Sequence, residues 1–146
     1  MGLKTALVIS FFVLSALLFF VHERRERVRI QRKLAGRPQL SPAEFGQQYA
    51  PQSESKAAVA CRVRAVIDSV AQQIPLNTAG LQPADAFVQD LNLDALDSMA
   101  SVELVVALEK EFGISIPDAD AETMRTVANI VEYVHSRSAP AAALSA

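Results

Sequence analysis

The longest run of apolar positions lies close to the N-terminus. The segment Ala6–Val21 has sixteen residues without a charge, and the whole uncharged run covers residues 5–22. At about 1.5 Å per residue, a helix of this length just crosses a hydrocarbon layer of about 30 Å. A cleaved signal peptide is the competing interpretation, but Lys4 is the only basic residue before the run and no A-x-A cleavage site follows it. We therefore expect an uncleaved transmembrane signal-anchor in residues 1–22.

Helical spacing of apolar positions returns near the middle of the chain. A segment that begins near Ser55 and ends before Pro75 has one apolar face, made by Val59, Val63, Val66, Ile67, Val70 and Ile74. A loop of about twenty residues, Leu76–Asp97, follows this helix. Loops of this length inside a small domain are unusual, so we expect this one to have a function.

The next helix is predicted from Asp97 or Ser98 to about Phe112, with Gly113 ending it in the left-handed conformation. Its apolar residues form two stripes. One belongs to the core: Leu104, Val105, Leu108 and Phe112. The other is flanked by Glu103, Glu109 and Lys110 and consists of Met99, Val102 and Val106. A small bundle cannot bury both stripes, so we expect the second to dock a basic, partly apolar partner, unless a following helix covers it.

Two further helices complete the pattern. A short one can follow Pro117, and Thr126 can cap a last one whose inward residues are Val127, Ile130, Val131 and Val134. No segment alternates apolar and polar positions as a half-buried strand does. The sequence therefore predicts an all-α antiparallel helical bundle in residues 56–135. The tail, residues 136–146, has no such pattern and is expected to be disordered.

Residues 23–55 differ in composition from both neighbours. The first part is rich in arginine, and Arg37–Ser55 is rich in Pro, Gln and Ser without sustained periodicity. We expect a basic juxtamembrane segment and a linker, with no core residue of the bundle before Ser55. Within this linker Ser41-Pro42-Ala43-Glu44 is a capping box, which predicts one or two helical turns.

The net charge of −2 conceals two oppositely charged regions. Residues 22–33 contain six Lys or Arg against two acids, whereas residues 56–135 contain five bases against twelve acids. The arginine run follows the apolar segment, so the positive-inside rule predicts a single pass of the inner (cytoplasmic) membrane with the C-terminal domain in the cytoplasm. An acidic domain repels phosphates, which argues against a nucleic-acid partner.

The chain has few residues that could perform chemistry directly. Its single cysteine, Cys61, lies on the first bundle helix and is expected at the edge of the core, while His22 and His135 lie at segment ends. These residues give no metal site and no disulfide framework. No histidine lies near Ser98, which excludes a Ser/His/Asp triad there.

Five short motifs follow one another in the predicted bundle: Phe87-Val88-Gln89-Asp90-Leu91, Asp97-Ser98-Met99, Val102-Glu103-Leu104-Val105, Ala107-Leu108-Glu109-Lys110-Glu111-Phe112 and Ile116-Pro117-Asp118. In identity and order they resemble the acyl carrier proteins, the phosphopantetheine-bearing four-helix carriers of fatty acid and polyketide assembly. The resemblance covers about 80 of the 146 residues. It implies a small four-helix carrier-type bundle, preceded here by a single transmembrane helix and a linker.

The resemblance also implies a site and a function. Ser98, preceded by Asp97, matches the serine that receives a covalent 4′-phosphopantetheine arm from coenzyme A. The protein would then be a carrier and not an enzyme. Its partners would be a phosphopantetheinyl transferase and enzymes that load and transfer acyl groups, in fatty acid, lipid or polyketide-type biosynthesis. Independently of the family, a serine at the first turn of a helix suits a phosphodiester, which the unpaired amides stabilise by about 0.3–1 kcal/mol.

The chain departs from the family pattern at this site. Met99 and Ala100 replace the usual leucine and acidic residue, and the segment Asp90–Ser98 is about three residues longer than in the family. A second alignment therefore places Asp94–Asp97 at the site, with the serine lost. We favour Ser98 because it keeps the spacing to Val102. The rival hypotheses are an arm-less adaptor that binds a partner through the helix after Ser98, a peptidyl carrier, and a lipid-surface or nucleic-acid-binding protein that uses the arginine run.

Overall fold

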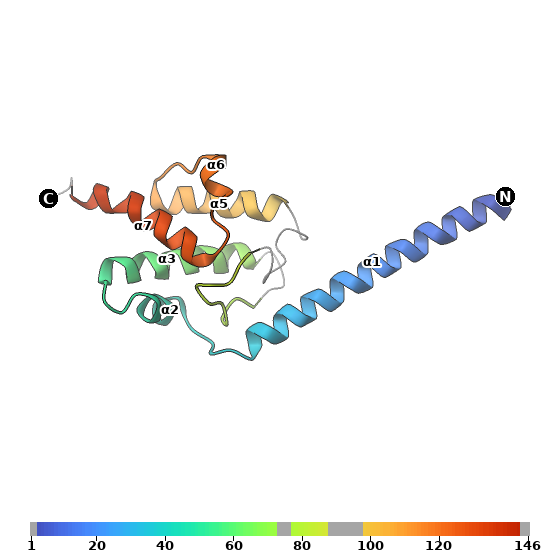
Figure 1. Cartoon of the computed structure of the whole chain (residues 1–146), viewed down its shortest axis with the longest axis horizontal. Helices are drawn as coiled ribbons and strands as arrows, with labels where there is room; N and C mark the ends of the chain where they lie inside the picture. The colour runs from blue at the N-terminus through green and yellow to red at the C-terminus, as the bar shows by residue number, and fades with distance from the viewer. Residues whose placement is uncertain (1–2, 73–76, 88–97, 144–146) are drawn as a thin grey trace.

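The structure is a computed structural model that describes residues 3–72, 77–87 and 98–143. It contains six helices in these ranges (Figure 1): α1 (Leu3–Ala35), α2 (Pro42–Tyr49), α3 (Glu54–Ala71), α5 (Ser98–Phe112), α6 (Asp118–Ala121) and α7 (Val127–Ala143). The described ranges contain no strand, only an isolated bridge between Ala86 and Thr126. The all-α prediction is confirmed.

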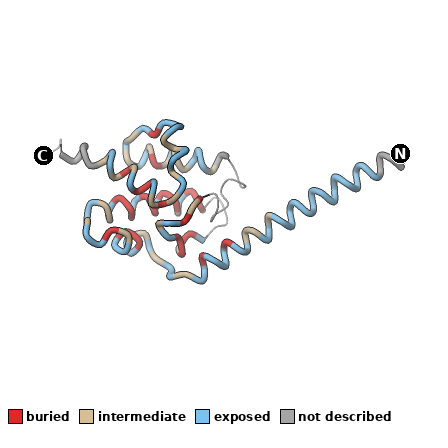
Figure 2. The backbone as a smooth tube through the Cα atoms, in the orientation of Figure 1, coloured by how far each residue is buried: buried red, intermediate tan, exposed pale blue. Residues whose placement is uncertain are grey.

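Helix α3 lies at the centre of the folded domain and packs against α2, α5 and α7. Its apolar face is buried as the helical spacing predicts, and so is that of α7: Val59, Val63, Val66, Ile67, Val70, Val127, Ile130, Val131 and Val134. Figure 2 shows these buried positions gathered where the helices meet. Ile74, the last position predicted for this face, lies outside the described residues.

The helix ends follow the local sequence signals. At α2 the Ser41 hydroxyl accepts a bond from the Glu44 amide, and the Glu44 carboxylate accepts one from the Ser41 amide, so the predicted capping box is present. At α7 the Thr126 hydroxyl accepts a bond from the Asn129 amide at 3.2 Å. Gly113 has a φ of 64° after α5, as expected for a helix-ending glycine.

Part of the predicted linker belongs to the folded domain. The aromatic ring of Phe45 in α2 is 2% exposed, and the Tyr49 hydroxyl donates to the Glu132 carboxylate of α7 at 3.2 Å. Helix α2 therefore packs on α3 as part of the folded domain. An eight-residue helix carries too few apolar positions to show a clear periodicity, which is why its packing could not be read from the sequence.

The end of α1 is also part of the core, contrary to the expectation that no core residue precedes Ser55. Ile30 and Leu34 are 7% and 1% exposed and belong to the same cluster of buried residues as α3 and α7. The backbone of Gly80 lies against them: a Cβ at this position would be 2.0 Å from the Leu34 carbonyl oxygen. Two apolar residues one turn apart, inside a run of arginines, do not form a periodic pattern that predicts burial.

The C-terminal tail is helical further than expected. Helix α7 extends to Ala143, into the tail for which the sequence shows no helical pattern. The Ser138 hydroxyl donates to the Val134 carbonyl at 2.7 Å within this extension.

The N-terminal half of α1 projects away from the other helices (Figure 1). From Leu7 to Val21 its apolar side chains are exposed, with Phe11 and Phe12 each at 67%. Helix Leu7–Ala35 is long and apolar enough to span a membrane, with a mean hydropathy of 1.8 over its most apolar window, and none of that window is buried. A signal sequence near an N-terminus meets the same criterion of length and composition.

Candidate functional site

Helix α5 begins at Ser98 within the described residues. Asp97 and the alternative site Asp94–Asp97 lie outside them. The amides of a first helical turn have no partner inside the helix, and the helix dipole adds positive potential at the same end. The residue that begins α5 therefore has a backbone environment that fits a phosphodiester, and the 4′-phosphopantetheine group is compatible with this position.

The rest of α5 is fixed to the domain by its inner face. Leu108 is 1% exposed, and the other residues of the predicted core stripe, Leu104, Val105 and Phe112, are half-buried against the core. At the far end, Arg62 of α3 donates to the Glu111 carboxylate at 3.0 Å and to the Glu111 carbonyl at 2.7 Å. Its guanidinium also lies 4.4 Å from the centre of the Phe112 ring. These contacts hold the helix in place while leaving its outer face open.

The second stripe of α5 is exposed in the structure. Val102 is 62% exposed and Val106 55%, and Glu103 beside them is exposed as well. Within the part of the chain that the structure describes, no following helix covers these valines, so α6 does not bury them. The Met99 side chain, the first member of the stripe, lies outside what the structure describes.

Glu109 has a structural contact that the sequence did not reveal. One of its carboxylate oxygens accepts a hydrogen bond from the Ile116 amide at 2.7 Å. Ile116 is itself buried. The half-buried Glu109 therefore fixes the connection between α5 and α6, in addition to any contact with a partner.

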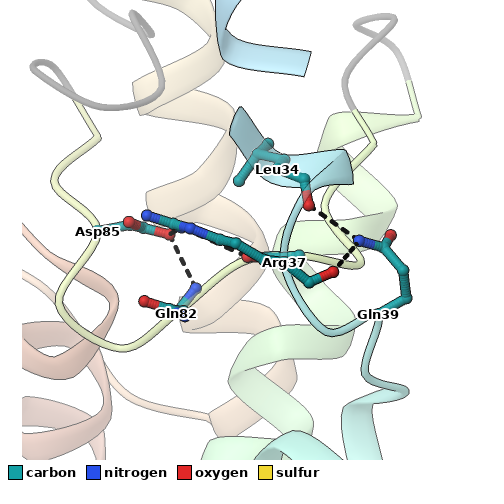
Figure 3. Close-up of polar contacts among 6 residues, drawn as sticks. Leu34, Arg37, Gln39, Gln82 and Asp85 are labelled. Atoms are coloured by element: carbon teal, nitrogen blue, oxygen red, sulfur yellow. Dashed lines mark hydrogen bonds and ion pairs between the residues drawn. The ribbon is translucent and has the colours of Figure 1, made fainter. Parts of the chain in front are cut away.

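A second cluster that sequence reasoning missed joins α1 to the segment 77–87 that leads towards the site (Figure 3). The Arg37 guanidinium donates to the Asp85 carboxylate at 2.6 Å, and the same carboxylate oxygen accepts from the Gln82 amide at 2.8 Å. The Gln39 side-chain amide donates to the Leu34 and Arg37 carbonyls at 2.9 and 2.8 Å. This contact could not be predicted from the sequence. Its only sequence signal is a pair of opposite charges 48 positions apart, and the chain contains many such pairs.

The Arg37–Asp85 contact is largely out of water. The side chain of Asp85 is 5% exposed and that of Arg37 19%. A hydrogen bond between the Leu40 amide and the Ala79 carbonyl, at 2.9 Å, continues the junction. The segment before the site is thereby held against the end of α1.

The described residues contain no group of three or more His, Cys, Asp and Glu side chains that could hold a metal ion. Cys61 is a free thiol at an intermediate position on α3, at the edge of the core as expected. Among the described residues, two carboxylates with shifted pKa values lie on α7 and α2. The Lys56 ammonium lowers the pKa of Glu132, and hydrogen bonds from the Ser41 backbone and hydroxyl lower the pKa of Glu44.

Known proteins match the same part of the chain. The family model described as "Phosphopantetheine attachment site" matches residues 64–134. An acyl carrier protein of Thermosynechococcus vestitus is 41% identical over 68 residues, which is 47% of this chain and 80% of the relative. One from Helicobacter hepaticus is 42% identical over 67 residues, 46% of this chain and 84% of the relative. This chain therefore belongs to the acyl carrier protein family: it is a carrier and not an enzyme, with a covalently attached 4′-phosphopantetheine.

Proposed function

We propose that the chain is a membrane-tethered acyl carrier protein whose 4′-phosphopantetheine arm is attached to Ser98. The observation that supports this most directly is that α5 starts at Ser98 within the described residues and carries an exposed apolar stripe one turn further on. When attached, the arm supplies the thiol on which an acyl group is held as a thioester. The pathways that fit are fatty acid, lipid and polyketide-type biosynthesis.

The outer face of α5 is proposed as the surface on which partner enzymes dock. It consists of Met99, Val102, Glu103, Val106 and Glu109. The exposure of Val102 and Val106 supports this, since an apolar stripe beside acidic residues attracts a partner with a basic, partly apolar surface. The partners would be the phosphopantetheinyl transferase that attaches the arm and the enzymes that load and transfer acyl groups.

Residues 5–22 are proposed as a single membrane span, with the carrier domain in the cytoplasm. Two features support the span: the exposed apolar half of α1 and its projection from the domain (Figure 1). The six Lys and Arg residues that follow the span support the orientation. Coenzyme A and acyl-loading enzymes are cytoplasmic partners of this family, so the orientation would place the arm where it can be loaded.

Incubation with coenzyme A and a phosphopantetheinyl transferase tests the attachment site. The intact mass of the full-length chain should rise by one phosphopantetheinyl group, and Ser98→Ala should abolish the increase. Ser101→Ala, which removes a hydroxyl from the same helix, is the matched control and should be modified like the wild type. An unchanged mass of the wild type with several transferases, or modification of Ser98→Ala, would show that Ser98 is not the site.

A further inference from the structure

The part of α1 between the apolar run and the domain has two opposite sides. At about 100° per residue, Ile30 and Leu34 point to one side, where they are buried in the core. Glu23, Glu26 and Arg27, all half-buried, share that side. The opposite side is formed by Val21, Arg24, Arg25, Val28, Arg29 and Arg32, which we call the arginine face.

All six residues of the arginine face are exposed along the helix. Val21 and Val28 lie within this face, at 39% and 42% exposure. Its charges are weakly compensated inside the protein. Arg29 has Glu26 at 3.6 Å, and no carboxylate of the described residues lies within ion-pair distance of Arg24, Arg25 or Arg32. By contrast, Arg27 on the other side of the helix pairs with Glu23 at 3.4 Å.

The position of this face along α1 determines what it can meet. It begins where the apolar run ends, and Arg32 lies eleven residues, or about 16 Å, beyond Val21. The headgroup layers of a bilayer extend roughly 5–8 Å on each side of the hydrocarbon. Arg24 and Arg25 fall in this layer if α1 spans the membrane, and a tilt of the helix towards the arginine face brings Arg29 and Arg32 down to it.

We infer that the arginine face binds the phosphate headgroups of anionic phospholipids at the cytoplasmic surface of the membrane. This rests on the membrane span proposed above. Guanidinium groups pair with phosphate oxygens through two parallel hydrogen bonds, and the two valines suit contact with the adjoining acyl boundary. Because the carrier domain is attached to the opposite side of α1, a tilt that lowers the arginine face raises the acidic domain away from the anionic surface. The lipid contact would thereby set the orientation in which the arm is presented.

Lipid binding to the full-length chain in uncharged detergent micelles tests this inference. Phosphatidylglycerol or phosphatidylcholine is titrated in, and bound lipid is counted by native mass spectrometry. A basic residue near an anionic surface contributes about fivefold in affinity, so phosphatidylglycerol should bind at least about tenfold more tightly than phosphatidylcholine. The variant with Arg24→Gln, Arg25→Gln and Arg32→Gln should lose this preference. The control variant, with Arg27→Gln, Lys110→Gln and Arg125→Gln, removes the same charge elsewhere and should retain it.

Other outcomes are equally decisive. Equal binding of the two lipids by the wild type would contradict the proposed lipid site. An equal loss of the lipid preference in the two variants would show that the arginine face has no specific role. Displacement of phosphatidylglycerol by a matching concentration of inorganic phosphate would point to a free-phosphate site, and stronger binding of a uridylate homopolymer would point to RNA. Resistance to alkaline extraction from vesicles is measured in parallel. A chain that resists extraction but shows no lipid preference refutes only this inference, whereas an extractable chain refutes the membrane span.

Discussion

Lys56 and Glu132 join the first turn of α3 to α7 by an ion pair, and the Tyr49 hydroxyl from α2 bonds to the same carboxylate. The Lys56 ammonium lowers the pKa of Glu132 below its ordinary value of 4.5, and its bond to Glu132 raises the pKa of Lys56 above 10.5. A lowered carboxyl pKa stabilises the fold above the unfolded pKa, and this stabilisation disappears as the pH falls through the folded value. The raised pKa of Lys56 contributes stability below pH 10.5, and this stabilisation is lost only as the pH rises above that value.

Replacement of Lys56 by methionine should therefore change the acid limb of the stability profile. Between pH 7 and pH 3 the melting temperature of the wild type should fall further than that of Lys56→Met, because the variant has no ion pair to lose. Lys110→Met, at an exposed position of α5, should follow the wild type. Thermal melts by circular dichroism across this range provide the measurement. Parallel profiles for the wild type and Lys56→Met would mean that the pair contributes nothing in solution.

Arg64 is a charged residue whose burial the sequence does not predict. It lies between apolar positions of α3 and is 1% exposed, because the ring of Phe45 lies 5.4 Å from its guanidinium. Its Nε donates to the Asp68 carboxylate at 2.7 Å, which compensates part of the cost of burying the charge. An arginine on a helix is ordinarily exposed. Its burial here depends on α2, whose packing the spacing of α3 could not indicate.

At the scale of helices, the sequence predicted the elements with strong local signals. The helices α3, α5, α6 and α7, the capping box of α2 and the exposed stripe of α5 all follow from periodicity and end signals. What it could not predict are the contacts that join elements far apart in the chain. The burial of Ile30 and Leu34, the Arg37–Asp85 pair and the bond from Ile116 to Glu109 depend on the relative positions of helices, which no local pattern specifies.

The Arg37–Asp85 pair can be tested as the link between α1 and the segment before the site. Removal of one partner leaves the other charge in a largely buried place, so Asp85→Ala should lower the free energy of unfolding by about 2–3 kcal/mol. In the double variant with Arg37→Ala the loss should be smaller than the sum of the single losses. Urea denaturation of the four proteins completes this double-mutant cycle. A coupling energy near zero would show that the two side chains do not interact in solution.

At the scale of the whole molecule, the end of α1 is packed against the carrier domain and is not connected to it by a loose linker. The matched residues 64–134 exclude α1, α2 and the start of α3. Yet α2 covers Arg64, the end of α1 contributes two core residues, and Arg37, two residues after α1, pairs with Asp85. A junction of this kind fixes the direction of α1 relative to the domain, whereas a flexible linker would only limit the distance between them. If α1 spans a membrane as proposed, the junction would also set how the domain is presented at its surface.

Two truncations separate these possibilities. The sequence alone predicts that a chain starting near Gln39 is soluble, helical and still modified at Ser98, because it places no core residue before Ser55. The structure predicts a loss of stability: a chain starting at Gln39 loses Ile30 and Leu34, each worth about 1.5–3 kcal/mol of apolar burial, and leaves Asp85 unpaired. A chain starting at His22 loses only the apolar run and keeps the junction.

We expect both truncated chains to be soluble and helical, with the Gln39 chain less stable by at least about 3 kcal/mol in urea denaturation. If modification at Ser98, followed by intact mass, proceeds in both chains while their urea midpoints coincide, α1 is a tether and the packing of its end has no energetic role. A lower midpoint in the Gln39 chain alone assigns the stabilising contacts to residues 22–38 and makes the end of α1 part of the folded carrier domain.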